Sequence, residues 1–146
     1  MVEKQILSIV MENEEGALAR LTDMFSARGF SIENINAGTV NLKDNTSSIT
    51  ITLCETDERI KKLILQLQRL IPVVSIKNIT KSNIEKEIAL INAKGALEVV
   101  EKYSATKIKD DFYELVASPN VIDDLVKELN DRECFSIVRS GIVAIG

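Results

Sequence analysis

The polar segment "NEEGAL", residues 13–18, has the residue types that best suit the binding of a small molecule. It follows an apolar run over residues 6–11 and precedes apolar residues at steps of three and four: Leu18, Leu21 and Phe25. That period is typical of one face of a helix, so Gly16 is predicted to lie at a strand-to-helix turn. Glycine permits a close backbone approach there, and the free N–H groups of a helix start attract carboxylates. Either the turn is simply tight or a ligand docks on it.

The composition is that of an ordinary globular protein, with 146 residues of which 45% are hydrophobic and 27% charged. This length corresponds to one average domain or two small ones. The net charge of -4 and the scattered four Phe and two Tyr provide no surface for nucleic acid. No run approaches the roughly 20 apolar residues of a membrane span, and the N-terminus does not resemble a signal peptide. We therefore expect a cytoplasmic protein with neither nucleic acid nor membrane as a partner.

Catalytic and metal-binding residue types are scarce. The sequence has no histidine, which excludes Ser-His and Cys-His nucleophile systems. Cys54 and Cys134 lie 80 positions apart without a CxxC motif, as expected for two reduced thiols rather than a zinc site. No pair of carboxylates is isolated in an apolar setting that would raise a pKa. We expect no catalytic residue and no metal site in this chain.

The first half of the chain alternates strand and helix patterns. The expected elements are strand 5–11, helix 17–28 closed by Gly29, strand 31–40, strand 47–53, helix 57–70 stopped by Pro72, and strand 73–79. Residues 42–45 form a polar turn between the middle strands. This order is βαββαβ.

The same order recurs after a polar connector, residues 80–83. The expected elements are strand 87–93, helix 96–104, strand 105–109, strand 112–118, helix 119–131, and one final strand 135–145. Pro119 suits the first helical position, with Ser118 as its cap. The prediction is an α+β fold of two ferredoxin-like domains, residues 1–79 and 84–146, each a four-stranded antiparallel sheet with both helices on one face. The face of each sheet that carries no helix must pack against the other sheet or against a second chain, so we expect a homo-oligomer.

Three segments carry a resemblance to a known family. "ILSIVMENEEGALARLTDMFSARGFSIENI", residues 6–35, resembles the N-terminal ACT domain of the acetolactate synthase (acetohydroxyacid synthase) small regulatory subunit. That family combines an apolar strand, an N-E-x-G-A-L turn and F-S-x-R-G-[YF]-x-I-E. "EKEIALI", residues 85–91, and "SIVRSGIVAI", residues 136–145, are similar to the opening strand and the V-x-R-S-G-[VI]-V motif of the second domain.

The resemblance implies a non-catalytic subunit in branched-chain amino-acid biosynthesis. Such a subunit forms a homodimer, binds the large catalytic subunit and raises its activity. It also makes that enzyme sensitive to valine or another branched-chain amino acid. The catalytic subunit is expected to hold thiamine diphosphate, Mg and FAD, and to join two pyruvates into 2-acetolactate with loss of CO2.

The resemblance also implies an effector site between two ACT domains. One chain contributes the strand-to-helix turn and the other its second strand. Carried over by motif, the turn side consists of Asn13, Gly16, Ala17 and Leu18, and the strand side of Ser31, Ile32 and Gly38. Many family members have asparagine where this chain has Ser31, so we expect a different effector affinity or choice.

Purely structural interpretations stand beside the functional ones. Asn13 can serve only to cap the turn, Gly16 only to permit tight helix-sheet packing, and Leu18 as a core residue. Arg139 is either a surface strand residue or part of a subunit interface. Glu14 and Glu15 complement the helix dipole and disfavour a phosphate ligand.

Three other functions are alternatives to the regulatory one. A small βαββαβ enzyme such as an acylphosphatase requires an arginine near a phosphate-binding loop, and neither "NEEGAL" nor "NAKGAL" supplies it. A free-standing ACT regulator needs no catalytic subunit. An effector domain of a transcription factor would need another chain to bind DNA.

Overall fold

The computed structural model describes residues 1–132 and 135–146, which form two compact units. Unit 1 comprises residues 1–84 and 144–146, and unit 2 comprises residues 85–143. Residues 80–83, predicted as a linker, therefore group with unit 1. The last three residues do so as well, and the Ala144 N–H lies 3.5 Å from Thr50 Oγ1.

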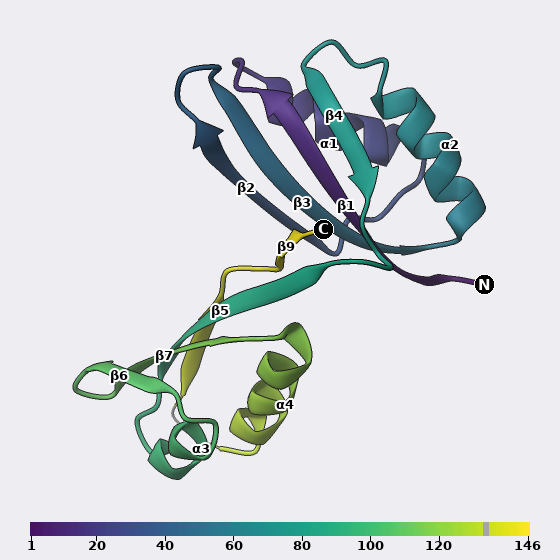
Figure 1. Cartoon of the computed structure of the whole chain (residues 1–146). Helices are drawn as coiled ribbons and strands as arrows, with labels where there is room; N and C mark the ends of the chain where they lie inside the picture. The colour runs from purple at the N-terminus through teal and green to yellow at the C-terminus, as the bar shows by residue number, and fades with distance from the viewer. Residues whose placement is uncertain (133–134) are drawn as a thin grey trace. The chain divides into compact units, whose positions relative to one another are not determined.

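Unit 1 has the predicted βαββαβ order (Figure 1). Its elements are β1 (Glu3–Glu12), α1 (Ala17–Ala27), β2 (Asn34–Asn41), β3 (Thr46–Glu55), α2 (Asp57–Leu67) and β4 (Val73–Asn78). The four strands form an antiparallel sheet in the order β2-β3-β1-β4. Because β2 ends this order, one of its edges has no neighbouring strand in the described chain.

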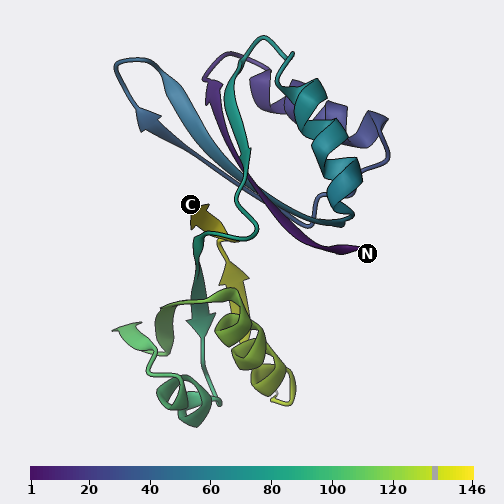
Figure 2. The same cartoon turned by 45° about the vertical axis from the view of Figure 1, so that its right-hand side comes forward.

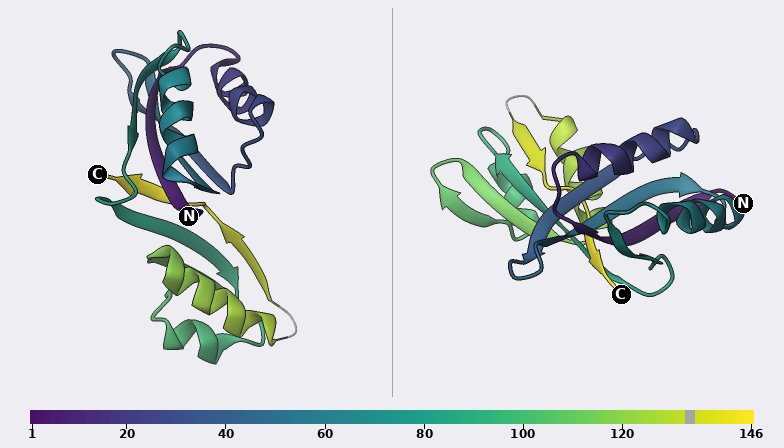
Figure 3. Two further views of the ribbon diagram at one scale, coloured as in Figure 1. Left: turned by 90° about the vertical axis from the view of Figure 1, so that its right-hand side faces the viewer. Right: turned by 90° about the horizontal axis from the view of Figure 1, so that it is seen from above.

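The core of unit 1 lies between the sheet and its two helices, which cover the same face (Figure 3). Strand residues alternate between faces, so β1 and β3 each direct every second, apolar residue toward the helices. The register places Ile9 opposite Ile49 and Leu7 opposite Ile51. Leu21 and Phe25 of α1 and Leu63 of α2 join this core. The other face carries polar residues such as Thr50 and Thr52.

Unit 2 repeats the order with one added strand (Figure 2). Its sheet and helices are β5 (Ile84–Asn92), α3 (Leu97–Lys102), β6 (Thr106–Lys109), β7 (Phe112–Ala117), α4 (Pro119–Asn130), β8 (Ser136–Arg139) and β9 (Val143–Ile145). The first residue of β5 and the last two of β9 group with unit 1. The sheet order is β6-β7-β5-β8, and β9 also pairs with β5. The prediction of one final strand over 135–145 is wrong. Gly141 has a φ of 83°, a left-handed conformation that interrupts the strand and gives this sheet five strands rather than four.

The start of α4 differs from its prediction in one detail. Pro119 occupies the first turn as expected, and Ser118 is the N-cap residue with an extended backbone. However, the Ser118 side chain makes no capping hydrogen bond. The fixed φ of proline is already compatible with the helix, so the helix starts without that bond.

Three other sequence expectations concern the cysteines, metal ligands and membrane spans. Cys54 is a free, exposed thiol, and Cys134 lies outside the described residues. Within residues 1–132 and 135–146, no cluster of three His, Cys, Asp or Glu side chains has the geometry to hold a metal ion. No helix in the described part of the chain is long and apolar enough to cross a bilayer.

An ion pair with one buried partner links β8 to β5 in unit 2. Glu87 on β5 is 2% exposed and accepts hydrogen bonds from Nε and Nη2 of Arg139 on β8, both at 2.7 Å. Arg139 Nη2 also lies 2.9 Å from Asp123 of α4. The bidentate bond to Glu87, with Asp123 beside it, raises the pKa of Arg139. Within the described chain Arg139 is therefore a partly exposed strand residue that pairs with a buried carboxylate.

We expect Arg139→Ala to lower the free energy of unfolding by about 2 to 3 kcal/mol, because it leaves the Glu87 carboxylate without its partner. Denaturant unfolding followed by circular dichroism measures the change. The control is Arg132→Ala, which removes an exposed ion pair with Glu98 and should cost about 1 kcal/mol or less. Equal losses in the two variants would show that the Glu87 pair has no special structural weight.

Candidate functional site

Gly16 shapes the junction between β1 and α1. It is the N-cap residue of α1 with φ 75° and ψ 3°, in the left-handed region that side-chain-bearing residues rarely adopt. No side chain caps this helix. The turn predicted at Gly16 is confirmed, and the glycine leaves the helix start uncovered.

Only some of the backbone N–H groups at the start of α1 have an acceptor in the chain. The Ala17 N–H donates to the Glu14 carbonyl at 3.1 Å, and the Arg20 N–H donates to the Gly16 carbonyl at 3.0 Å. Leu18 and Ala19, in the first turn, have no acceptor within the helix, because the first N–H groups of a helix precede its ladder. These two amides carry the positive end of the helix dipole and suit a carboxylate ligand.

Asn13 joins the turn to the neighbouring β2–β3 connection. Its backbone N–H donates to the Asn45 carbonyl at 2.8 Å, and its Nδ2 lies 3.4 Å from Asn45 Oδ1. Asn45 Nδ2 in return donates to the Asn13 carbonyl at 3.2 Å. The capping interpretation of Asn13 is therefore wrong, since α1 has no side-chain cap. Asn13 instead holds two loops together at this end of the sheet.

One of the two acidic residues directly before Gly16, Glu14, forms an ion pair. Glu14 lies 2.9 Å from Arg20 Nη2, and both side chains are about half exposed. The pair draws the carboxylate toward α1 and reduces its repulsion of an anion at the helix start. The turn thus tolerates a carboxylate despite its acidic sequence.

A cavity of about 170 Å³ opens beside this turn. It is lined by Met11, Glu12, Asn13, Glu14, Gly16, Ala17, Leu18, Ala19, Ala37, Ser47 and Ile49. Met11, Ala17 and Ile49 are buried apolar residues, whereas Leu18 is 45% exposed. The structure therefore gathers the four predicted turn residues around one small pocket with amides and apolar groups. Leu18 is a rim residue rather than a core residue.

The three residues predicted for the strand side lie elsewhere in the same chain. Ser31 and Ile32 precede β2, so the predicted strand start at residue 31 is wrong. Ile32 packs against the core cluster of unit 1, and Gly38 lies on β2 opposite Ser48. None of the three lines this cavity. They were assigned to the partner chain, and that assignment stays a prediction.

Sequence reasoning missed the lining residues on β2 and β3. Ala37 pairs with Ile49, and Thr39 pairs with Ser47. The alternation of residues 47–53 predicted which β3 residues face the helices. Placing Ala37 beside them also required the hairpin register, which includes an irregularity between Thr39 and Asn41.

A second cavity in unit 1, of about 240 Å³, is polar. It is lined by Gln5, Asp57, Lys61, Asn78, Thr80 and Lys81. Gln5 is fully buried; its Nε2 donates to Asp57 Oδ1 at 2.8 Å, and its Oε1 accepts from Asn78 Nδ2 at 2.9 Å. The Gln5 bond lowers the pKa of Asp57. Because Gln5, Asp57, Asn78 and Thr80 hydrogen-bond to one another, this cavity fits a structural network better than a ligand site.

Unit 1 matches a known domain family, and the chain resembles a solved structure. Residues 7–75 match the family described as the AHAS small subunit-like ACT domain. A crystal structure of the acetolactate synthase small subunit from Thermotoga maritima superposes with a TM-score of 0.84 at 22% identity. The superposition covers 98% of this chain and 96% of that one. This likeness shows the same fold over nearly the whole chain.

Two curated relatives extend the match in sequence. The probable acetolactate synthase small subunit of Archaeoglobus fulgidus is 36% identical over 60% of this chain, and the match spans 55% of that protein. The acetolactate synthase small subunit of Buchnera aphidicola is 30% identical over 97% of this chain and 98% of its own length. With near-complete coverage in both directions, the chain belongs to the acetolactate synthase small subunit family, and residues 7–75 are its ACT domain.

Proposed function

We propose that this chain is the regulatory subunit of an acetolactate synthase. It binds the large catalytic subunit, raises its activity and confers inhibition by valine or another branched-chain amino acid. Thiamine diphosphate, Mg and FAD belong to the catalytic subunit, which acts on pyruvate in the cytoplasm. The observation that carries the proposal is the uncapped, glycine-started helix that opens onto a small pocket with apolar walls.

The pocket offers a partner for each part of an amino acid. The Leu18 and Ala19 amides receive the carboxylate at the helix start. The Asn13 amide oxygen accepts from the ammonium group. The apolar side chain of the effector then lies against Leu18 on the turn side.

The free energies available indicate that one chain alone is not sufficient to bind the effector. Burial of an isopropyl group contributes roughly 1.5 to 3 kcal/mol, whereas a Kd of 0.1 mM requires about 5.5 kcal/mol. Polar contacts and a second, preformed wall must supply the difference. Ser31, Ile32 and Gly38 of a second copy are the proposed second wall.

The sheet order of unit 1 supports a homodimer. β2 is one of the two edge strands, with β4 at the other end of the sheet, and an edge strand has N–H and C=O groups available to another chain. Pairing through the β2 edge would bring the second strand of one copy near the turn of the other. An effector bound there changes the catalytic subunit only if it binds one assembly state more tightly than another.

The proposal predicts a defined kinetic result with the catalytic subunit from the same organism. Addition of this chain should raise the rate of acetolactate formation, and a valine titration should then lower it. The measurement is a direct acetolactate assay with and without the chain. A higher rate without a valine response would remove the effector assignment. No effect on the rate would favour a free-standing ACT regulator.

We also expect Gly16→Asp to weaken valine binding at least tenfold while the chain stays folded. A carboxylate at this position repels the carboxylate of the ligand and competes for the helix-start amides. Isothermal titration calorimetry with valine measures the loss. Valine binding equal to that of the unmodified chain would exclude this turn as the site.

Gly29→Asp is the matched control for that variant. Gly29 also has a left-handed backbone, with φ 71°, and open space where a Cβ would lie. The two substitutions therefore impose similar backbone strain, but Gly29 follows the C-terminal end of α1. A loss of valine binding in Gly16→Asp that Gly29→Asp does not share is thus an effect of location rather than of strain.

A further inference from the structure

A groove with positive charges runs between α1 and α2 of unit 1. Two adjacent cavities of about 360 and 160 Å³ share Arg28 and Gln66 in their linings. We call this feature the basic groove; its lining consists of Met24, Arg28, Phe30, Arg59, Lys62, Leu63, Gln66, Arg69 and Leu70. Four of these residues are cations, four are apolar, and no acidic residue is among them.

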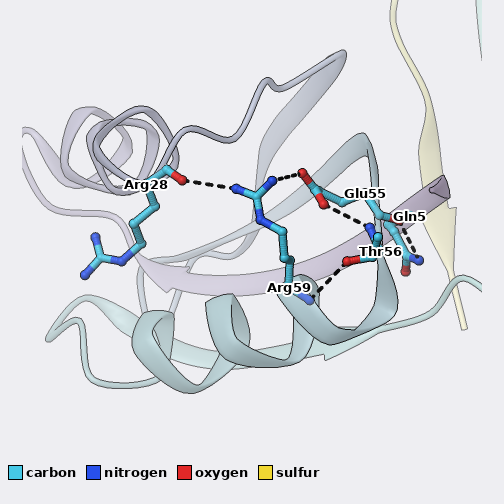
Figure 4. Close-up of polar contacts among 5 residues, drawn as sticks. All are labelled: Gln5, Arg28, Glu55, Thr56 and Arg59. Carbon is cyan, nitrogen blue, oxygen red and sulfur yellow. Dashed lines mark hydrogen bonds and ion pairs between the residues drawn. The ribbon is translucent and has the colours of Figure 1, made fainter. Parts of the chain in front are cut away.

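The cations of the basic groove are held in place by local contacts. The Arg59 guanidinium lies 4.6 Å from the centre of the Phe30 ring, and its Nη2 donates to the Arg28 carbonyl at 3.3 Å. Arg59 also pairs with Glu55. Figure 4 shows that the Arg28 guanidinium points away from Arg59 while its carbonyl accepts the bond. Arg28 Nε in turn donates to Gln66 Oε1.

The charge of the groove is only partly balanced. Glu55 pairs with Arg59, and Glu58 pairs with Lys62 at 2.7 Å. Arg28 and Arg69 are exposed and form no ion pair with any residue that the structure describes. Because the chain as a whole has a net charge of -4, a surplus of positive charge here is a local departure from the overall surface. Such a patch favours association with an acidic surface.

We propose that the basic groove is the docking surface for an acidic segment of the catalytic subunit. The inference rests on the proposed function, because it names the part of this chain that holds that partner. Met24, Phe30 and Leu70 are partly exposed and provide apolar contacts between the cations, whereas Leu63 belongs to the buried core. A peptide with acidic and apolar residues matches both kinds of contact, whereas a small inorganic anion would leave the apolar side chains unused.

A local structural role for the same arginines predicts a different outcome. Arg28 is the C-cap residue of α1, and Arg69 is the second residue after α2, so both complement a helix dipole. Loss of that role would lower thermal stability and leave partner binding unchanged. Partner affinity and its salt dependence therefore separate the two roles.

The test compares the full chain with a double variant, Arg28→Gln and Arg69→Gln. Glutamine keeps a polar side chain, although a shorter one, and removes the charge. Affinity for the immobilised catalytic subunit is measured at low and high salt. We expect about tenfold weaker binding at low salt, a flatter salt dependence, and an unchanged Kd for valine in the isolated chain.

The matched control is Lys127→Gln with Arg132→Gln, at the end of α4. Arg132 is the second residue after α4, as Arg69 is after α2, and both donate their backbone N–H to a carbonyl three residues earlier. The control should bind the catalytic subunit like the unmodified chain. Unchanged affinity and salt dependence in the groove variant would overturn the inference while the proposed function stands. Absence of binding by the unmodified chain would overturn both.

Discussion

Gly16 has a left-handed backbone, with φ 75°, at the point where β1 turns into α1, and the geometry of the candidate effector site depends on it. A residue with a Cβ would be strained there by roughly 1 to 2 kcal/mol. The glycine gives α1 an N-cap without a side chain, so no hydroxyl or carboxylate occupies its first amides. The same turn places Asn13 against the Asn45 loop, which fixes one wall of the cavity.

The rest of unit 1 supports this junction without forming part of the site. Register between β1 and β3 sets Met11 and Ile49 under the start of the helix, and Leu21 and Phe25 hold α1 on the sheet. A site built at the end of rigid elements keeps its donors oriented before the ligand arrives. The edge position of β2 leaves the proposed second wall to another copy of the chain. Effector binding and assembly are therefore thermodynamically linked in this account.

Local patterns predicted most of the fold because its elements are strongly periodic. Alternation in β3 and the apolar stripes of the helices fixed the order of unit 1, and the repeat of that order revealed unit 2. The break at Gly141 was missed, since the apolar run on either side of it is typical of one continuous strand. The turn side of the site could be predicted from one glycine and the start of a helix. Predicting Ala37 and Ser47 as lining residues also requires the strand register.

Contacts between residues that are far apart in the chain could not be predicted from the sequence alone. Nothing local links Glu87 to Arg139, which are 52 positions apart and meet only when β8 pairs with β5. The basic groove likewise combines Arg28 with Arg59 and Arg69, from separate segments that the fold of unit 1 brings together.

The most direct test of the central claim is a valine titration of the full chain followed by backbone amide chemical shifts. The account predicts that the largest changes occur at Gly16, Ala17, Leu18 and Ala19, with further changes near Ser31 and Gly38 from the partner copy. Changes confined to the polar cavity around Gln5, or to unit 2, would contradict it.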